Sequence, residues 1–171
     1  MTGILKKLEG DDRRSIGRVE EVVNAVLKEP ALFETIFNAM LADDPVVRMR
    51  AADAVEKISV IHPQYLQPYK DKLIKRISSI DQQEVRWHVA QLLPRLALSG
   101  PERKTVVNIL FGYLNDKSKI VKTFSLQALS DFAQQDDSLR PRVVEVLADM
   151  IQTGSAAVKS RGKKLLSELK K

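Results

Sequence analysis

Residues 43–58 read DDPVVRMRAADAVEKI, and a related stretch, DQQEVRWHVAQLLPRL, occupies residues 81–96. Two looser versions follow: DKSKIVKTFSLQAL at residues 116–129 and GSAAVKSRGKKLLSEL at residues 154–169. One chain therefore contains four variants of a single segment. Repetition with a period between 20 and 50 residues is the sequence signature of repeat architectures.

The four stretches align on a valine, and the intervals between these valines are 38, 36 and 37 residues. The aligned valines are Val47, Val85, Val121 and Val158. Small or apolar residues recur four, seven, eight and eleven positions after each of them, which is the spacing of one face of an α-helix. A cation stands one residue after each valine, as Arg48, Arg86, Lys122 and Lys159. The small residues at the fourth position predict close approach of neighbouring helices.

Each of these segments follows another stretch with apolar residues three and four apart, so the sequence predicts helical hairpins of roughly 37 residues. A proline lies at or near the start of each first helix, where the missing N–H costs least. These prolines are Pro30, Pro63, Pro101 and Pro141. Asp44 and Pro45 are the predicted N-cap and first residue of one second helix, and Asp81 with Glu84 is the predicted capping box of the next.

The period, the D-x-x-V-R turn and the A-x-x-A-V/L helix resemble those of the HEAT repeat family, best at residues 43–58 and 81–96. The resemblance implies an all-α fold, a right-handed α-α superhelix of about four to five hairpins. We expect one α-solenoid domain over residues 1–171, because a hairpin covers its apolar faces only by stacking on neighbours. The expected divisions are a degenerate repeat or cap at 1–30 and repeats at 31–62, 63–100, 101–137 and 138–171.

Composition narrows the class of protein. Hydrophobic residues make up 44% of the 171 residues and aromatic residues only 5%, which predicts a mainly aliphatic core. Cysteine is absent, and neither a signal peptide nor an apolar run of membrane-spanning length is present, so we expect a soluble, cytoplasmic protein. The net charge of +6 arises mostly at residues 158–171, where six basic residues accompany one acid. That helix is the expected cap of the stack.

No motif for catalysis, metal binding or cofactor binding is found. His62 and His88 are 26 residues apart and neither has a ligand at metal-binding spacing. There is no nucleophile motif and no glycine loop that would hold phosphate. We therefore expect no enzyme activity, no metal and no cofactor.

The turn acids Asp43, Asp81 and Asp116 precede helices that carry a cation one turn inside. In HEAT proteins such residues commonly form a ladder of acid–base pairs between successive repeats. The alternative is a basic stripe that contacts phosphates.

The segment around Trp87 is the candidate interaction site. If the apolar face of this helix is buried, its other positions line the concave side, as second helices do in solenoids of this kind. The expected partner-binding residues are Arg48, Arg50, Arg86, Trp87, His88, Arg95, Lys122 and Phe124. Tryptophan beside arginine is typical of an interface hot spot, although Trp87 packed between repeats is an equal alternative. Pro94 should kink or end the helix.

We expect a scaffold or adaptor that binds another protein, in particular an acidic segment or helix. The alternative is nucleic-acid binding, because HEAT-like solenoids include DNA glycosylases with a basic concave face, aromatic residues and a carboxylate. Here the available carboxylates are Asp53 and Asp131, whose helical positions do not obviously converge with Trp87. The sequence leaves the oligomeric state open.

Overall fold

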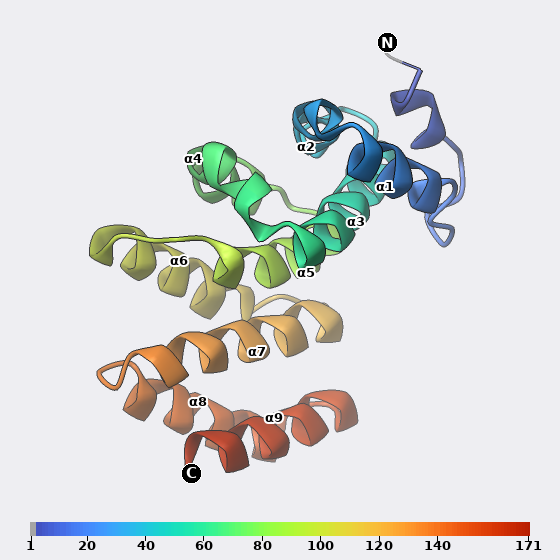
Figure 1. Cartoon of the computed structure of the whole chain (residues 1–171). Helices are drawn as coiled ribbons and strands as arrows, with labels where there is room; N and C mark the ends of the chain where they lie inside the picture. The colour runs from blue at the N-terminus through green and yellow to red at the C-terminus, as the bar shows by residue number, and fades with distance from the viewer. Residues whose placement is uncertain (1–2) are drawn as a thin grey trace. The chain divides into compact units, whose positions relative to one another are not determined.

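The computed structural model describes residues 3–171, and over this range the chain is all-helical with no β-strand, as predicted. It forms two compact units, Met1–Ala97 and Leu98–Lys171, which are described separately. Within each unit, the helices follow one another in chain order in Figure 1. The division into the predicted repeats stays a prediction.

The first unit contains five α-helices: α1 (Val19–Lys28), α2 (Phe33–Ala39), α3 (Pro45–Ile61), α4 (Lys70–Lys75) and α5 (Gln83–Leu92). Its short 3₁₀ helices are η1 (Leu5–Lys7), η2 (Pro30–Leu32), η3 (Pro63–Tyr69), η4 (Ile77–Ser79) and η5 (Leu93–Arg95). Helix α3 packs against α1, α2 and α5, so it is the central helix of this unit (Figure 1).

The second unit contains α6 (Gly100–Tyr113), α7 (Lys119–Gln135), α8 (Arg140–Thr153) and α9 (Ala156–Leu169). Helix α9 packs against both α7 and α8, and α7 also packs against α6. The apolar face of α9 is covered by these contacts, with Val158, Leu165 and Leu169 buried. Of the basic residues of this helix, Lys163 and Lys164 are exposed, whereas Lys159 and Arg161 are half-buried.

The repeat determines where the core lies. Each aligned valine is the third residue of its helix, α3, α5, α7 or α9, and each is buried. The positions four, seven, eight and eleven residues later are buried as well, except Leu166, which is half-buried. The same sequence pattern therefore produces the same burial in four helices, as the period predicted.

The core of the first unit also contains an aromatic cluster that joins α2 to η3. The rings of Phe37 and Tyr69 stack with centroids 4.8 Å apart, and Phe33 meets Tyr65 edge-on at 5.5 Å. Such pairs add to the stabilisation that burial of aliphatic side chains provides. Although aromatic residues are few, four of them gather at this contact.

The helix ends agree with the sequence at most positions. Asp44 caps α3 by accepting hydrogen bonds from the backbone N–H groups of Val46 and Val47, and Pro45 is the first residue of the helix. The capping box predicted for Asp81 and Glu84 is wrong, because Gln82 is the N-cap of α5 and makes no side-chain cap bond. Pro94 ends regular α-helical bonding in α5, which continues as η5.

Candidate functional site

A pocket of about 300 Å³ opens on the first unit, between the loop after η1 and the helices α3 and α5. We call it the Trp87 pocket. Its lining residues come from three segments and are Arg13, Arg14, Ser15, Ile16, Met49, Arg50, Asp53, Glu84, Trp87 and His88. Three of the predicted partner-binding residues, Arg50, Trp87 and His88, thus lie around one concavity.

Helix α5 supplies the aromatic wall. Trp87 is half-buried, and its ring lies 5.7 Å from the ring of His88, centroid to centroid. Val85 and Val89 are fully buried on the opposite side of the helix, which turns Trp87 toward the pocket. Trp87 therefore packs against its neighbours with part of its surface and lines the pocket with the rest.

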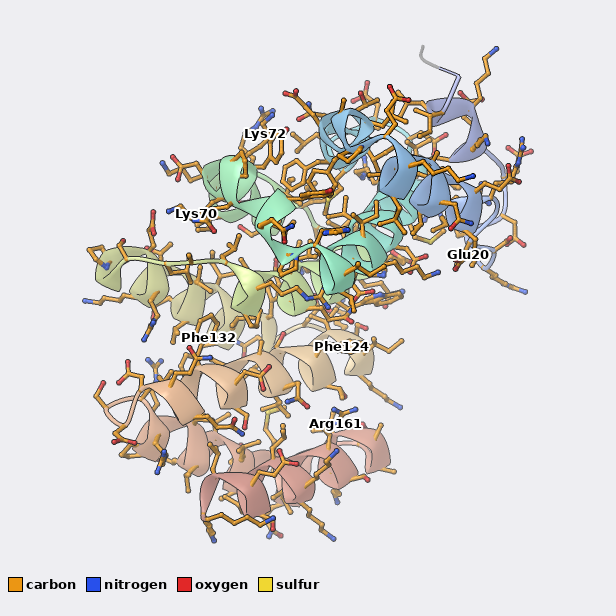
Figure 2. All side chains as sticks on the ribbon, in the orientation of Figure 1. Glu20, Lys70, Lys72, Phe124, Phe132 and Arg161 are labelled. Carbon is orange, nitrogen blue, oxygen red and sulfur yellow. The ribbon has the colours of Figure 1, made fainter. Side chains whose placement is uncertain are left out.

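His88 joins α5 to α3. It is buried, with its Nδ1 2.6 Å from the Glu84 carbonyl oxygen and its Nε2 3.3 Å from Oδ1 of Asp53. The second oxygen of Asp53 lies 3.1 Å from Nζ of Lys57, one turn further along α3. Lys57 also donates to Glu20 of α1 at 2.7 Å, and Figure 2 labels this glutamate. A chain of polar contacts thus connects α5, α3 and α1.

These contacts determine the charge on Asp53. Burial raises the pKa of the Asp53 carboxyl group, but hydrogen bonds and positive charge from His88 and Lys57 outweigh that effect, so its pKa lies below the ordinary value. Asp53 is therefore an anion whose charge is balanced inside the molecule.

Arg50 lines the pocket and is only 4% exposed. Its Nε donates to the Ser15 carbonyl at 3.0 Å and its Nη2 donates to the Asp12 carbonyl at 3.1 Å. Its Nη1 donates to the carbonyls of Leu8, at 3.2 Å, and Glu9. The guanidinium group thus holds the N-terminal loop on α3, and its donors are not available to a partner.

Two glycines let the loop close around this guanidinium group. Gly10 has φ +148° and Gly17 has φ +57°, both in the region that side chains disfavour. A Cβ atom on Gly10 would lie 2.6 Å from Nη1 of Arg50, and one on Gly17 would lie 2.8 Å from its Cζ. At both positions a side chain would be disfavoured by the backbone conformation and would also clash with Arg50.

The other predicted arginines of the first unit also bind within the chain. Arg48 donates through Nε to the side-chain oxygen of Gln82 at 2.8 Å, and through Nη1 to the carbonyl of Ala42 at 2.9 Å. For Arg48, the side-chain contact with the next turn is thus made by Gln82, where the ladder predicted Asp81. Arg86 pairs with Asp81 of its own turn at 3.2 Å.

Arg95 binds helix α3. It pairs with the Glu56 carboxylate at 2.6 Å and donates to Oγ of Ser59 at 2.7 Å, so it fastens the end of η5 to α3.

The last two predicted residues, Lys122 and Phe124, belong to α7 of the second unit, where both are half-buried. Lys122 lines a different pocket, formed within that unit by residues of α6, α7 and α8. In Figure 2 Phe124 is labelled on α7 and Arg161 on α9, and Arg161 donates to Gln127 of α7 at 2.7 Å. Neither Lys122 nor Phe124 lines the Trp87 pocket.

The structure brings Trp87 and Asp53 to one pocket, so the expectation that their positions do not converge is wrong. They meet because α3 and α5 pack side by side. Asp131 lies on α7 in the second unit, where it accepts a hydrogen bond from Gln127 at 2.9 Å.

Sequence reasoning missed the loop residues Arg13, Arg14 and Ile16. Ile16 is 47% exposed, which is unusual for a large apolar side chain. The available signal was a pair of arginines and an isoleucine next to a glycine, outside any helix. Because these residues show no helical period, the spacing of apolar residues could not predict where their side chains lie.

In the described part of the chain, residues 3–171, no three His, Asp or Glu side chains come together in a way that could hold a metal ion. Over the same residues, no helix is both long and apolar enough to cross a membrane.

A model of the HEAT repeat domain matches residues 6–169, nearly the whole chain. The chain belongs to the HEAT repeat family. Two crystal structures of engineered proteins, determined by the Northeast Structural Genomics Consortium, share the fold with TM-scores of 0.67. Their sequences are 18% and 17% identical to this HEAT-repeat chain, and the alignments cover 98% of it and 79% and 78% of the engineered chains. The comparison with curated proteins found no match.

Proposed function

We propose that this HEAT-repeat chain is a non-enzymatic binding module, an adaptor that contacts another protein through the Trp87 pocket. The observation that supports the proposal most directly is the composition of the pocket wall. The chain's one tryptophan lies half-buried beside the exposed Ile16 and the exposed Arg13 and Arg14. Tryptophan and arginine are the residues most enriched where a few side chains supply most of the binding energy.

The pocket is also built before any partner arrives. Arg50 holds one wall in place through backbone carbonyls, and the contact between His88 and Asp53 ties the other wall to α3. A preformed site loses less conformational entropy on binding than a flexible one. The cytoplasmic location predicted from the cysteine-free sequence is part of the proposal, as is a wider partner-binding face that includes Lys122 and Phe124.

The test is affinity capture from nuclease-treated extract of the source cells, followed by titration of the purified chain with the recombinant captured protein. We expect wild type to bind and Trp87→Ala to lose binding. Ile16→Ser tests the same pocket at an exposed residue, where folding is not at risk. Ile61→Ala is the matched control, because Ile61 is 56% exposed and lies outside the pocket. Binding that survives both pocket substitutions would exclude this site.

Nucleic-acid binding is the second candidate, and one observation favours it. Trp87, Asp53 and three arginines line the same pocket, which is the kind of residue set that the alternative requires. Two observations weigh against it: Asp53 already pairs with Lys57 at 3.1 Å, and Met1–Ala97 carries 15 Lys or Arg against 14 Asp or Glu. Filter binding at two salt concentrations tests it, because phosphate contacts weaken as salt rises.

A further inference from the structure

We infer that the Trp87 pocket takes an acidic segment of a partner protein, which inserts one apolar side chain and places carboxylates against Arg13 and Arg14. The inference rests on the proposed function and specifies the chemistry of the partner. It follows from the apolar walls of the pocket and from a local excess of positive charge.

The apolar part of the site is formed by Ile16, Met49 and Trp87. Met49 is buried in α3, while Ile16 of the loop and Trp87 of α5 remain partly open to solvent. The volume of about 300 Å³ is at the lower limit of ligand pockets and suits one large apolar side chain. Filling the pocket would remove the exposed surface of Ile16 and Trp87 from water, which favours binding.

The positive charge comes from three arginines that have no carboxylate partner in the described part of the chain. Arg13 and Arg14 are exposed, and no ion pair of their guanidinium groups is found among residues 3–171. Nearby Arg18 differs, since it donates two hydrogen bonds of 2.7 Å to Glu21. Arg50 meets only backbone carbonyls, so its buried charge is solvated by dipoles but not neutralised.

The pocket lining contains two acids, Asp53 and Glu84, against three arginines. Asp53 also has a contact of its own, with Nζ of Lys57 at 3.1 Å. The arginines therefore outnumber the acids that line the pocket. A carboxylate from outside would therefore be attracted to the exposed Arg13 and Arg14, because a guanidinium group can donate two parallel hydrogen bonds to a carboxylate.

A protein segment fits these features better than a nucleic acid does. Apolar walls suit an aliphatic or aromatic side chain, whereas a phosphate backbone requires a continuous basic track. Met1–Ala97 carries 15 Lys or Arg against 14 Asp or Glu, so the unit has almost no net charge to attract a phosphate backbone.

The experiment selects displayed random peptides of about twelve residues, long enough to present an anchor and both flanks, on the full chain. Selected peptides are then synthesised and titrated, with the fluorescence of the chain's one tryptophan, Trp87, as the signal. We expect one Leu, Ile, Met or Phe flanked by at least two acids. Arg13→Glu combined with Arg14→Glu should weaken binding by about tenfold or more, as loss of a charged contact of about 1.4 kcal/mol would.

The matched control is Lys6→Glu combined with Lys28→Glu, which changes the net charge equally at two exposed residues outside the pocket. This control should bind within about twofold of wild type if local charge is decisive. Ile16→Ser should weaken the same peptides by about tenfold, since it removes part of the apolar wall.

The failure of this inference differs from the failure of the proposed function. Peptides that change Trp87 fluorescence but lack acids, or that ignore the arginine substitutions, would overturn the acidic partner and leave the site intact. Recovery of no peptide would also overturn it. Capture of a protein partner that does not depend on Trp87 or Ile16 would instead overturn the proposed function.

Discussion

Arg50 is only 4% exposed, and its guanidinium group donates hydrogen bonds to backbone carbonyls within residues 8–15. A buried charge costs less free energy when it is hydrogen-bonded, and here backbone carbonyls accept from all three guanidinium nitrogens. The loop in turn has no regular structure from Glu9 to Gly17 apart from turns, so Arg50 is the main polar contact that orders it. Arg50 is thus a positioning residue for the pocket.

Replacement of Arg50 by methionine keeps the aliphatic stem but removes these bonds. We expect Arg50→Met to lower the free energy of unfolding by about 2–3 kcal/mol, because several carbonyls lose a charged donor. Trypsin should also cleave faster after Arg13 and Arg14 once the loop is released. The control is Arg76→Met at an exposed arginine. Unchanged cleavage of the loop would contradict the role of Arg50.

Because of its contacts, Asp53 should make the stability of the folded chain depend on pH. Its folded pKa is below the ordinary value of 3.8, so its contribution to stability is complete above that value and is lost as the pH falls through the folded pKa. Asp53→Asn should cost about 1–2 kcal/mol near neutral pH, since a charged hydrogen bond is lost. The difference from wild type should shrink in strong acid.

Urea unfolding at a series of pH values measures this difference. Asp71→Asn is the matched control, because Asp71 pairs with Lys75 at the same i, i+4 spacing on an exposed surface. It should change stability by less than about 0.5 kcal/mol. A constant difference between wild type and Asp53→Asn from neutral pH to strong acid would contradict the assignment.

Three of the four second helices begin with the same kind of side-chain cap. The N-caps of α3, α7 and α9 are Asp44, Ser118 and Ser155, and each accepts a hydrogen bond from the aligned valine of its helix. In α5 Gln82 takes the cap position, and its side chain is instead bonded to Arg48 and to the Pro45 carbonyl. In α5, therefore, the side chain at the cap position contacts α3 instead of capping its own helix.

Asp44→Ala tests the value of a cap. It should lower the free energy of unfolding by about 1 kcal/mol, the usual cost of removing a capping side chain. Asp43→Ala is the matched control, since Asp43 is the adjacent exposed acid and its side chain is not the cap of α3. Chemical denaturation of both variants gives the comparison. Equal losses would show that charge, and not the cap, is responsible.

At the scale of the whole molecule, stability depends on second helices that pack through small residues. Ala51 of α3, Val89 of α5, Ser125 of α7 and Gly162 of α9 occupy the same repeat position, and all are buried. A Cβ atom on Gly162 would lie 3.0 Å from Cγ1 of Ile151, which shows how closely α9 approaches α8. A large charged side chain at such a position would force helices apart.

Ala51→Arg should therefore lower the free energy of unfolding by more than about 3 kcal/mol, through overpacking and through burial of a charge without a partner. Val89→Arg should act in the same way. Val60→Arg is the control on α3, because Val60 is 62% exposed. Thermal unfolding followed by circular dichroism is the measurement. An unchanged melting temperature for Ala51→Arg would contradict the packing described above.

Spacing along the chain was enough to predict the helices, their buried faces, the cap at Asp44 and the interruption at Pro94. Those features depend on residues within one helix or one turn, where spacing fixes which side chains share a face. Spacing could not predict that Arg50 contacts a loop about forty residues away, that Asp53 and Trp87 line one pocket, or that Arg13, Arg14 and Ile16 complete it. Periodicity predicts that a polar side chain points away from the core, but only the packing of other segments determines what that side chain contacts.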